Sequence, residues 1–121
     1  MRLTFLGTGS AMPSPTRLQS SLLVESDDHT LLVDCGSGAA HRLAQADISH
    51  NAVDAVLLTH THLDHVADLS TQEQARWLDD TPELTVYGPP GTGEVVETLL
   101  GVNNLTERAD VSVIELDRSG E

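Results

Sequence analysis

A histidine-rich segment follows an apolar run near the middle of the chain, and no other feature constrains the fold as strongly. Residues 54–60 read DAVLLTH, which is typical of a short buried strand, and His62, Asp64 and His65 follow at once. In open α/β sheets, ligands bind beyond the carboxyl ends of the strands. The segment therefore predicts an α/β fold in which this strand brings a cluster of imidazoles and a carboxylate to one edge of the sheet.

The remaining apolar segments predict the same class of fold. Strand-like composition occurs at residues 2–7, 20–26, 30–36, 54–60, 83–88 and 109–116. Helical spacing occurs at residues 37–47, 70–80 and 92–102, with Ser37, a Ser70–Glu73 capping box and Thr92 as the expected N-terminal caps. Strands come first and then alternate with helices, which predicts helices packed outside a sheet. The first three strands are almost continuously apolar, as expected where both faces of a sheet are covered.

Length and composition indicate one intracellular domain. A chain of 121 residues has the usual size of a single domain. Cys35 is the only cysteine, so no internal disulfide can form, which suits a reducing cytoplasm. No apolar run approaches the roughly 20 residues that span a bilayer, and the first residues lack the long apolar core of a secretory signal. We therefore expect a cytoplasmic protein with no membrane partner.

The charge balance is strongly acidic. Nineteen acidic residues face six basic ones, all of them arginine, and the formal net charge is −13. One interpretation is an ordinary acidic domain from a cell with arginine-rich codon usage. We favour adaptation to a salt-rich cytoplasm, because salt screens self-repulsion while a carboxylate-rich surface stays hydrated. No basic cluster for nucleic-acid binding is visible, so an RNA substrate would depend on bound metal or on arginines supplied elsewhere.

The residue types in the 60–65 segment are those that bind divalent metals. Imidazole nitrogens and carboxylate oxygens ligate zinc at about 2.0–2.2 Å. His60 and His62 are two residues apart and point the same way in an extended chain, whereas Asp64 and His65 follow as the chain turns. One segment could thus offer two ligands to each of two ions, and such pairs generate a hydroxide nucleophile at neutral pH. The isolated His29, His41 and His50 are expected to have no site role.

The segment THTHLDH resembles the metal-binding signature of the metallo-β-lactamase superfamily. The stretches FLGTGSAMPSPTRLQSSLLVE and LLVDCGSG resemble the start of ribonuclease Z and its relatives, which process the 3′ end of transfer RNA precursors. The resemblance covers residues 2 to about 102 and includes LTVYGPPGT. It implies a four-layer αββα sandwich of two βα halves with two metals at the sheet edge, of which this chain supplies about the first half.

The resemblance also assigns roles to individual residues. His60 and His62 would ligate the first metal, and Asp64 and His65 the second, with Asp64 also orienting the attacking water as the catalytic residue. Asp34 in the DCG segment would support the metal-binding turn through hydrogen bonds. The cofactors implied are two divalent ions, with Zn²⁺ expected, although nitrogen and oxygen ligands also suit manganese and iron.

The chain departs from ribonuclease Z in two respects. Leu63 stands where that family usually has glycine, and no histidine follows His65, so each metal has two ligands where a catalytic zinc normally has three. Because the chain also stops straight after a strand, we interpret residues 1–121 as a single incomplete domain that requires the remaining half for a complete site. An exposed half-sandwich is expected to associate, for example as a homodimer.

Three functions remain open at this stage. The first is two-metal hydrolysis of an RNA or small-molecule phosphodiester, with the 121-residue chain alone inactive. The second keeps the fold and changes the substrate to a thioester or other small ester. The third is a truncated, non-catalytic metal-binding fragment.

Other motifs are less informative. Residues 88–95, GPPGTGEV, resemble a P-loop, but Glu94 and Val95 replace the lysine and hydroxyl residue that bind phosphate and Mg²⁺, so ATP binding is not expected. The GTGS stretch at 7–10 is either a plain turn or the floor of the metal site. Cys35 is not expected to be a nucleophile, because no basic partner is evident.

The salt-adaptation hypothesis predicts that stability rises with KCl. The free energy of unfolding, measured in urea at increasing KCl from 0.1 to about 3 M, should increase as screening shortens the Debye length to a few ångströms. NaCl serves as the control for a specific effect of potassium. Equal stability at low and high salt would contradict the hypothesis.

Overall fold

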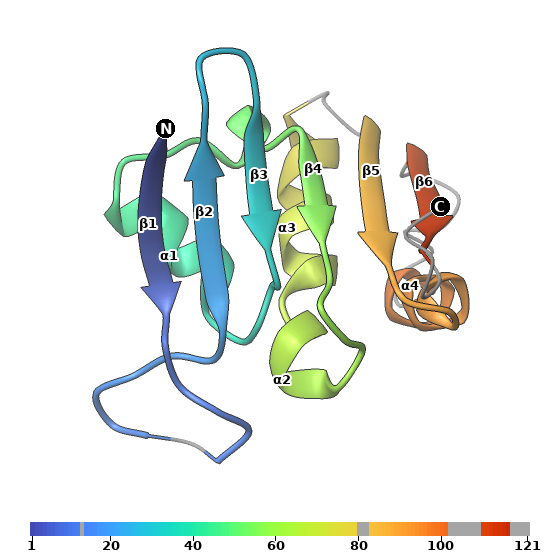
Figure 1. The fold of residues 1–121 in the computed structure, drawn as a ribbon, viewed down its shortest axis with the longest axis horizontal. Coiled ribbons are helices and arrows are strands. Elements are labelled where there is room, and N and C mark those ends of the chain that lie inside the picture. The colour runs from blue at the N-terminus through green and yellow to red at the C-terminus, as the bar shows by residue number, and fades with distance from the viewer. Residues whose placement is uncertain (13, 80–82, 102–109, 117–121) are drawn as a thin grey trace.

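The computed structural model describes residues 1–12, 14–79, 83–101 and 110–116, which form one mixed sheet with helices on one side (Figure 1). The sheet has six strands in chain order: β1 Arg2–Gly7, β2 Ser21–Glu25, β3 Thr30–Val33, β4 Ala55–Leu57, β5 Glu83–Gly88 and β6 Asp110–Glu115. β1, β2 and β3 pair antiparallel, whereas β3 to β6 pair parallel. The α/β class expected from the sequence is confirmed.

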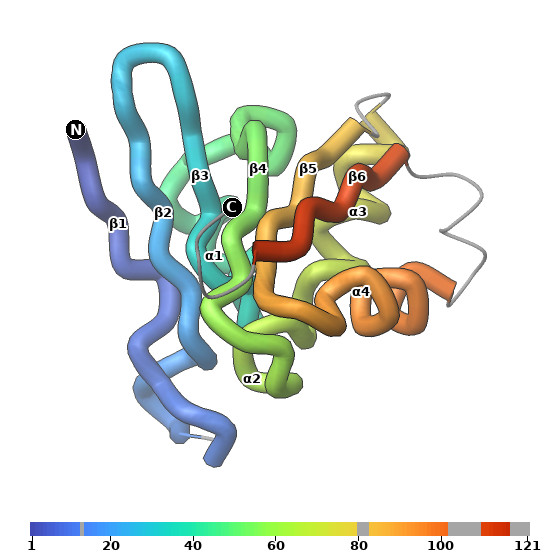
Figure 2. The backbone as a smooth tube through the Cα atoms, turned by 45° about the vertical axis from the view of Figure 1, so that its right-hand side comes forward, coloured from blue at the N-terminus to red at the C-terminus, as the bar shows by residue number. Residues whose placement is uncertain are grey.

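Helices join the parallel strands and lie on one face of the sheet, except for the short α2 (Leu63–Val66), which lies beyond the carboxyl end of β4 (Figures 1 and 2). They are α1 Ala39–Gln45, α2 Leu63–Val66, α3 Leu69–Leu78 and α4 Thr92–Leu100, with a short 3₁₀ helix, η1, at His50–Ala52. Right-handed crossovers between strands in sequential order place the longer connecting helices on the same side. Between the two layers lies a core that includes Leu23, Leu32, Leu43, Val56, Leu69, Val86 and Val96. Among the described helices none has the length and apolar character needed to cross a bilayer.

The second face of the sheet is apolar and, within the described residues, uncovered. The strand register aligns alternate side chains into two rows: Leu3, Val24, Leu31, Ala55, Thr85 and Ser112, then Phe5, Leu22, Val33, Leu57, Tyr87 and Ile114. No member of either row is fully buried, and Phe5 is 64% exposed, whereas Val56 and Val86 on the helical face are 0% exposed. The continuous apolar runs predicted two covered faces, and the described helices cover one.

Two strands end earlier than the sequence predicts, and both ends shape the functional site. β3 stops at Val33, because Asp34 adopts a left-handed backbone conformation with φ of 60°. β4 stops at Leu57, so His60 lies in the following turn and not on the strand. The expected ends at residues 80, 102 and 109 lie outside the described residues.

All three predicted helix caps are wrong. Glycines with positive φ, Gly38 at 92° and Gly91 at 97°, precede α1 and α4 in place of the expected Ser37 and Thr92. Thr92 is buried inside the first turn of α4, where its hydroxyl donates to the Pro89 carbonyl at 2.6 Å. Tight strand–helix connections require left-handed backbone at these positions, which glycine adopts without a steric penalty.

The expected capping box on α3 is also absent. The helix begins at Leu69, one residue before Ser70, and follows Asp68. The Asp68 carboxylate accepts a hydrogen bond from the Ala40 backbone N–H of α1 at 2.7 Å, so it links two helices and leaves its own helix uncapped. Glu73, the expected capping partner, is 0% exposed and faces the core.

Two ionisable side chains of α3 are buried and behave differently. Arg76 donates to the carbonyls of His50, Val53 and Glu83 at 2.9, 2.7 and 2.6 Å, which ties α3 to η1 and β5. Neither carboxylate oxygen of Glu73 has a hydrogen-bond partner among the described residues. Burial raises the pKa of Glu73 to about 8; nearby Arg76 lowers it, whereas Asp110 and Glu83 raise it further. At neutral pH this carboxyl group is therefore mainly protonated.

The raised pKa predicts that Glu73 destabilises the fold at alkaline pH. The ordinary pKa is 4.5 and the folded value about 8, so stability is full below 4.5 and falls as pH rises through 8. Glu73→Gln keeps the shape of the neutral acid and should raise the free energy of unfolding at pH 9 by at least about 1 kcal/mol, with little effect at pH 4.5. Urea unfolding at both pH values measures this difference, with the exposed Glu97→Gln as the matched control. An unchanged pH trend in Glu73→Gln would contradict the assignment.

Candidate metal centre

The turn after β4 gathers three side chains that can hold a metal ion. His60, His62 and Asp64 each offer one ligand atom, and these atoms all lie within 4.8 Å of one another. The rings of His60 and His62 meet edge to face, with centroids 4.8 Å apart. His62 is exposed, whereas His60 and Asp64 are half-buried. The turn thus keeps two imidazoles and a carboxylate in one accessible group at the edge of the sheet.

The donor set and its spacing fit a zinc-like ion. Ligands placed tetrahedrally at 2.0–2.2 Å from zinc lie roughly 3.3–3.6 Å from one another. The side chains of His60, His62 and Asp64, whose ligand atoms lie within 4.8 Å, would therefore close by about 1 Å or less, and the exposed His62 ring has room to turn. Asp64 Oδ2 and His65 Nε2 are 3.2 Å apart, close to the spacing of two ligands of one ion.

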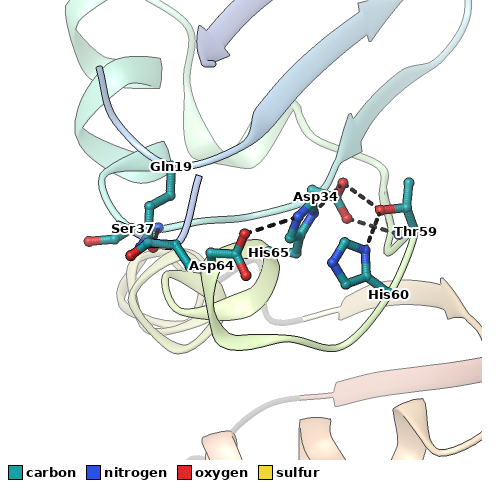
Figure 3. Close-up of polar contacts among 8 residues, drawn as sticks. Gln19, Asp34, Ser37, Thr59, His60, Asp64 and His65 are labelled. Atoms are coloured by element: carbon teal, nitrogen blue, oxygen red, sulfur yellow. Dashed lines mark hydrogen bonds and ion pairs between the residues drawn. The ribbon is translucent and has the colours of Figure 1, made fainter. Parts of the chain in front are cut away.

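His65 lies between two carboxylates (Figure 3). Its Nε2 is 3.2 Å from Asp64 Oδ2, and its Nδ1 is 2.8 Å from Asp34 Oδ2. The second contact is close, but its direction does not make a hydrogen bond, so Nδ1 has an electrostatic partner only. The His65 ring also contacts the His60 ring, with centroids 3.7 Å apart. Asp64 therefore adjoins both His65 and the pair His60 and His62.

Asp34 links the end of β3 to the turn after β4. This side chain is 4% exposed, and its two carboxylate oxygens accept hydrogen bonds from the Thr59 backbone N–H and the Thr59 hydroxyl, both at 2.8 Å. Its own backbone N–H donates to the Leu57 carbonyl at 2.8 Å, and its carbonyl accepts from the Ser21 hydroxyl at 3.0 Å. The residue before His60 is thus held by a buried carboxylate through two separate bonds.

The Thr59 hydroxyl also fixes which nitrogen of His60 carries a proton. Thr59 Oγ1 lies 3.2 Å from His60 Nδ1, and its single hydrogen is donated to Asp34. The hydroxyl can therefore only accept from His60, so Nδ1 is the protonated nitrogen of the neutral ring. Nε2 then has a free electron pair, which is the form of imidazole that binds metal.

The backbone of residues 35–36 supports the metal-binding turn from behind. The Cys35 N–H donates to the His65 carbonyl at 2.6 Å, and the Cys35 carbonyl accepts from the Asp68 N–H at 3.0 Å. A Cβ atom on Gly36 would lie 2.3 Å from the Asp64 carbonyl oxygen, so no larger residue fits. The Cys35 thiol is fully buried, and burial first, then Asp68 and Asp34, raises its pKa far above the usual range.

The GTGS stretch lies beside this turn. Gly9 donates to the Leu18 carbonyl at 2.7 Å, which closes the loop between β1 and β2. Gln19, at the end of that loop, accepts from the Ser37 backbone N–H at 3.1 Å, and Figure 3 shows this pair next to Asp64. The loop therefore borders the metal cluster without supplying a side chain to it.

The other candidate motifs lie outside the cluster. His29, His41 and His50 belong to the β2–β3 turn, α1 and η1, and none joins the group of metal-ligand atoms found within the described residues. In the P-loop-like stretch, the Gly93 N–H donates to the Glu115 carboxylate of β6 at 2.9 Å. A backbone N–H of this stretch is thus already bonded to an acidic side chain of the same chain.

Comparison with protein families identifies the family of this chain. The family model described as Anti-Pycsar protein Apyc1 matches residues 1–103. The chain belongs to this family. Ribonuclease Z of Mycolicibacterium gilvum is 45% identical over 104 residues, which cover 83% of this chain and 36% of that protein. The chain therefore spans about a third of the length of this relative.

Solved structures show the same fold. The short form of human tRNase Z is 29% identical with a TM-score of 0.83, over 95% of this chain and 44% of that one. The metallo-β-lactamase fold protein YhfI from Bacillus subtilis is 29% identical with a TM-score of 0.75, over 94% and 44%. The metallo-β-lactamase fold and the resemblance to ribonuclease Z expected from the sequence are confirmed, with a match to part of the longer chains.

Thr59 was not recognised from the sequence as a site residue, and its position predicts a role for its hydroxyl. Thr59→Val removes the acceptor for His60 Nδ1–H and one hydrogen bond to Asp34, so the His60 ring should populate the Nε2–H form. Zinc affinity should fall about tenfold, as for other groups that orient metal ligands. Nitrogen-15 NMR of the His60 ring measures the tautomer without metal, and Thr59→Ser is the matched control that retains the hydroxyl. The same tautomer in all three proteins would refute this role.

Proposed function

We propose that the chain forms part of a two-metal hydrolase that cleaves phosphodiester bonds in RNA, in the manner implied by ribonuclease Z. The observation that carries the proposal is the group of His60, His62 and Asp64, whose ligand atoms lie within 4.8 Å of one another. The named ribonuclease Z and tRNase Z relatives support the substrate class.

The ligands divide into two pairs. His60 and His62 would hold the first ion, and Asp64 and His65 the second. This division is supported by the 3.2 Å spacing of Asp64 Oδ2 and His65 Nε2 and by the exposed position of His62. Divalent ions bound there would supply a nucleophilic water at neutral pH and neutralise charge on the phosphate oxygens. Zinc is the expected ion.

Asp64 is the proposed catalytic residue. Its carboxylate adjoins both the His60–His62 pair and His65, so it can accept a hydrogen bond from the attacking water while it holds an ion. Asp34 would act through Thr59 and His65, since it contacts both and lies too deep to reach a substrate. Its role is to hold the turn in a geometry that keeps the ligands together.

The open face of the sheet supports a requirement for a second layer. Phe5, Leu3 and Ile114 are 64%, 54% and 43% exposed in an apolar face that no described residue covers. We propose that residues 1–121 are an incomplete domain and that the remaining half of an αββα sandwich packs here and supplies the missing ligands. Pairing of two copies through the same face, as a homodimer, is the alternative.

A cavity beside the metal turn favours one alternative substrate class. Leu63 is 68% exposed and, with Val66, Val95 and Leu99, lines an apolar hollow of about 320 Å³ between the metal turn and α4. An acyl chain of a thioester or small ester would fit such a surface better than a phosphate would. A non-catalytic metal-binding fragment remains the third interpretation. A cytoplasmic location and salt adaptation stay predictions.

The proposal predicts weak metal binding and no turnover for the 121-residue chain alone, because the proposed division gives each ion two ligands from the described residues, where a catalytic zinc normally has three. After removal of metal with EDTA, calorimetric titration with Zn²⁺ should give binding that His62→Ala reduces, through loss of the first ion, and that the control His29→Ala leaves unchanged. Equal zinc binding by both variants would overturn the proposed centre. Tight binding of two zinc ions with hydrolysis of bis-p-nitrophenyl phosphate would overturn the incomplete-domain proposal.

The substrate class is tested by assaying hydrolysis of a panel of substrates with the protein produced from the complete reading frame. The panel is bis-p-nitrophenyl phosphate, a transfer RNA precursor and a thioester. Cleavage of the precursor at its 3′ side is the expected result. Turnover of the thioester alone would replace the first function with the second.

A further inference from the structure

The few arginines of this acidic chain are not distributed evenly. Of the four in the described residues, Arg76 is buried and bonded to three carbonyls, and Arg2 lies 3.9 Å from Glu25. The other two, Arg17 and Arg42, both line one cavity of about 330 Å³. In a chain with net charge −13, it is notable that both of the other described arginines line the same hollow.

The cavity lies between the end of β1, the loop before β2 and helix α1. Its lining includes Thr8, Ser14 and Thr16 and, among the described residues, no aspartate or glutamate. The surroundings of Arg17 and Arg42 in this hollow therefore offer hydrogen-bond donors and positive charge without a competing carboxylate in its wall. That combination suits an anion that accepts several hydrogen bonds at once.

Arg42 is held in place before any ligand arrives. Its Nε donates to the Leu6 carbonyl and its Nη1 to Gln45 Oε1, both at 3.0 Å, and no contact among the described residues occupies Nη2. Because Gln45 uses its oxygen for Arg42, its Nε2 amide must donate to His41 Nε2, 3.0 Å away. His41 in its neutral form then carries its proton on Nδ1, as a further donor on the lining of the cavity.

We propose that Arg17, Arg42 and His41 form a phosphate-binding subsite separate from the metal centre. Arg17 makes no hydrogen bond or ion pair within the described part of the chain and can close on the ligand, whereas Arg42 is already oriented. The loop that carries Arg17 ends at Gln19, which contacts Ser37 beside Asp64 (Figure 3). A backbone phosphate of RNA could thus be held here while another part of the strand reaches the metal turn. The assignment to RNA, but not to phosphate, rests on the proposed function.

The test uses the 121-residue chain without metal, so that binding at the metal turn does not contribute. Inorganic phosphate is titrated at constant ionic strength, at the lowest KCl at which the chain is folded, and backbone amide shifts are followed by NMR. We expect saturable shifts at residues 14–18 and 41–45. Arg17→Gln should weaken binding about tenfold through loss of a charge-assisted contact. Arg17 is exposed, so this variant is not expected to unfold.

Arg2→Gln is the matched control, because it removes the same charge from a position outside the cavity. Arg42→Lys keeps the positive charge but loses the planar guanidinium with its several N–H donors, so it should weaken phosphate binding as well. A second arm measures binding of a single-stranded RNA 12-mer by fluorescence anisotropy. Weaker RNA binding in Arg17→Gln than in Arg2→Gln identifies RNA as the source of the phosphate, and equal RNA binding identifies free phosphate.

Two results would overturn the subsite. One is the absence of saturable shifts with phosphate. The other is an equal loss of phosphate affinity in Arg17→Gln and Arg2→Gln, which would show a general effect of net charge. Neither result bears on zinc binding at residues 60–65, so failure of the subsite and failure of the metal centre are distinguishable.

Discussion

The bonds between the buried Asp34 carboxylate and Thr59 are the interaction on which the candidate site depends. They join the end of β3 to the turn that follows β4, two segments 25 residues apart in the chain. A carboxylate that is 4% exposed is costly unless its oxygens are bonded, and the Thr59 N–H and hydroxyl satisfy one oxygen each. The same carboxylate lies 2.8 Å from His65, so one buried group adjoins residues on both sides of the metal turn.

The left-handed backbone of Asp34 makes this arrangement possible. With φ of 60°, the chain leaves the strand at once, and Cys35 and Gly36 pass directly behind the turn that holds Asp64 and His65. A regular strand continuing to residue 36 would have separated these segments. Local strain at a non-glycine residue is typical of functional sites, where the surrounding contacts offset it.

The sequence predicted the order of strands and helices along the chain and the fold class, because both follow from apolar periodicity. It also predicted that the histidines of residues 60–65 lie close together, because they are only a few residues apart within one turn. It did not predict the caps. Asp68 bonds Ala40, a residue of another helix, and Gly38 and Gly91 occupy left-handed positions set by how the strands enter the helices. It also missed Thr59, since a threonine within an apolar run has no local signal, and its importance arises only when Asp34 lies opposite. Contacts between residues far apart in the chain determine these caps and the role of Thr59, and such contacts cannot be read from local sequence patterns.

We propose that the side chains of residues 60–65 bind metal as a unit. Anomalous diffraction from crystals grown with zinc tests it most directly, because it locates each ion and its ligands. We expect one anomalous peak bonded to His60 and His62 and a second bonded to Asp64 and His65, while Asp34 stays bonded to Thr59. Zinc bound only at His29, His41 or His50, with the 60–65 side chains as separate as before, would contradict it.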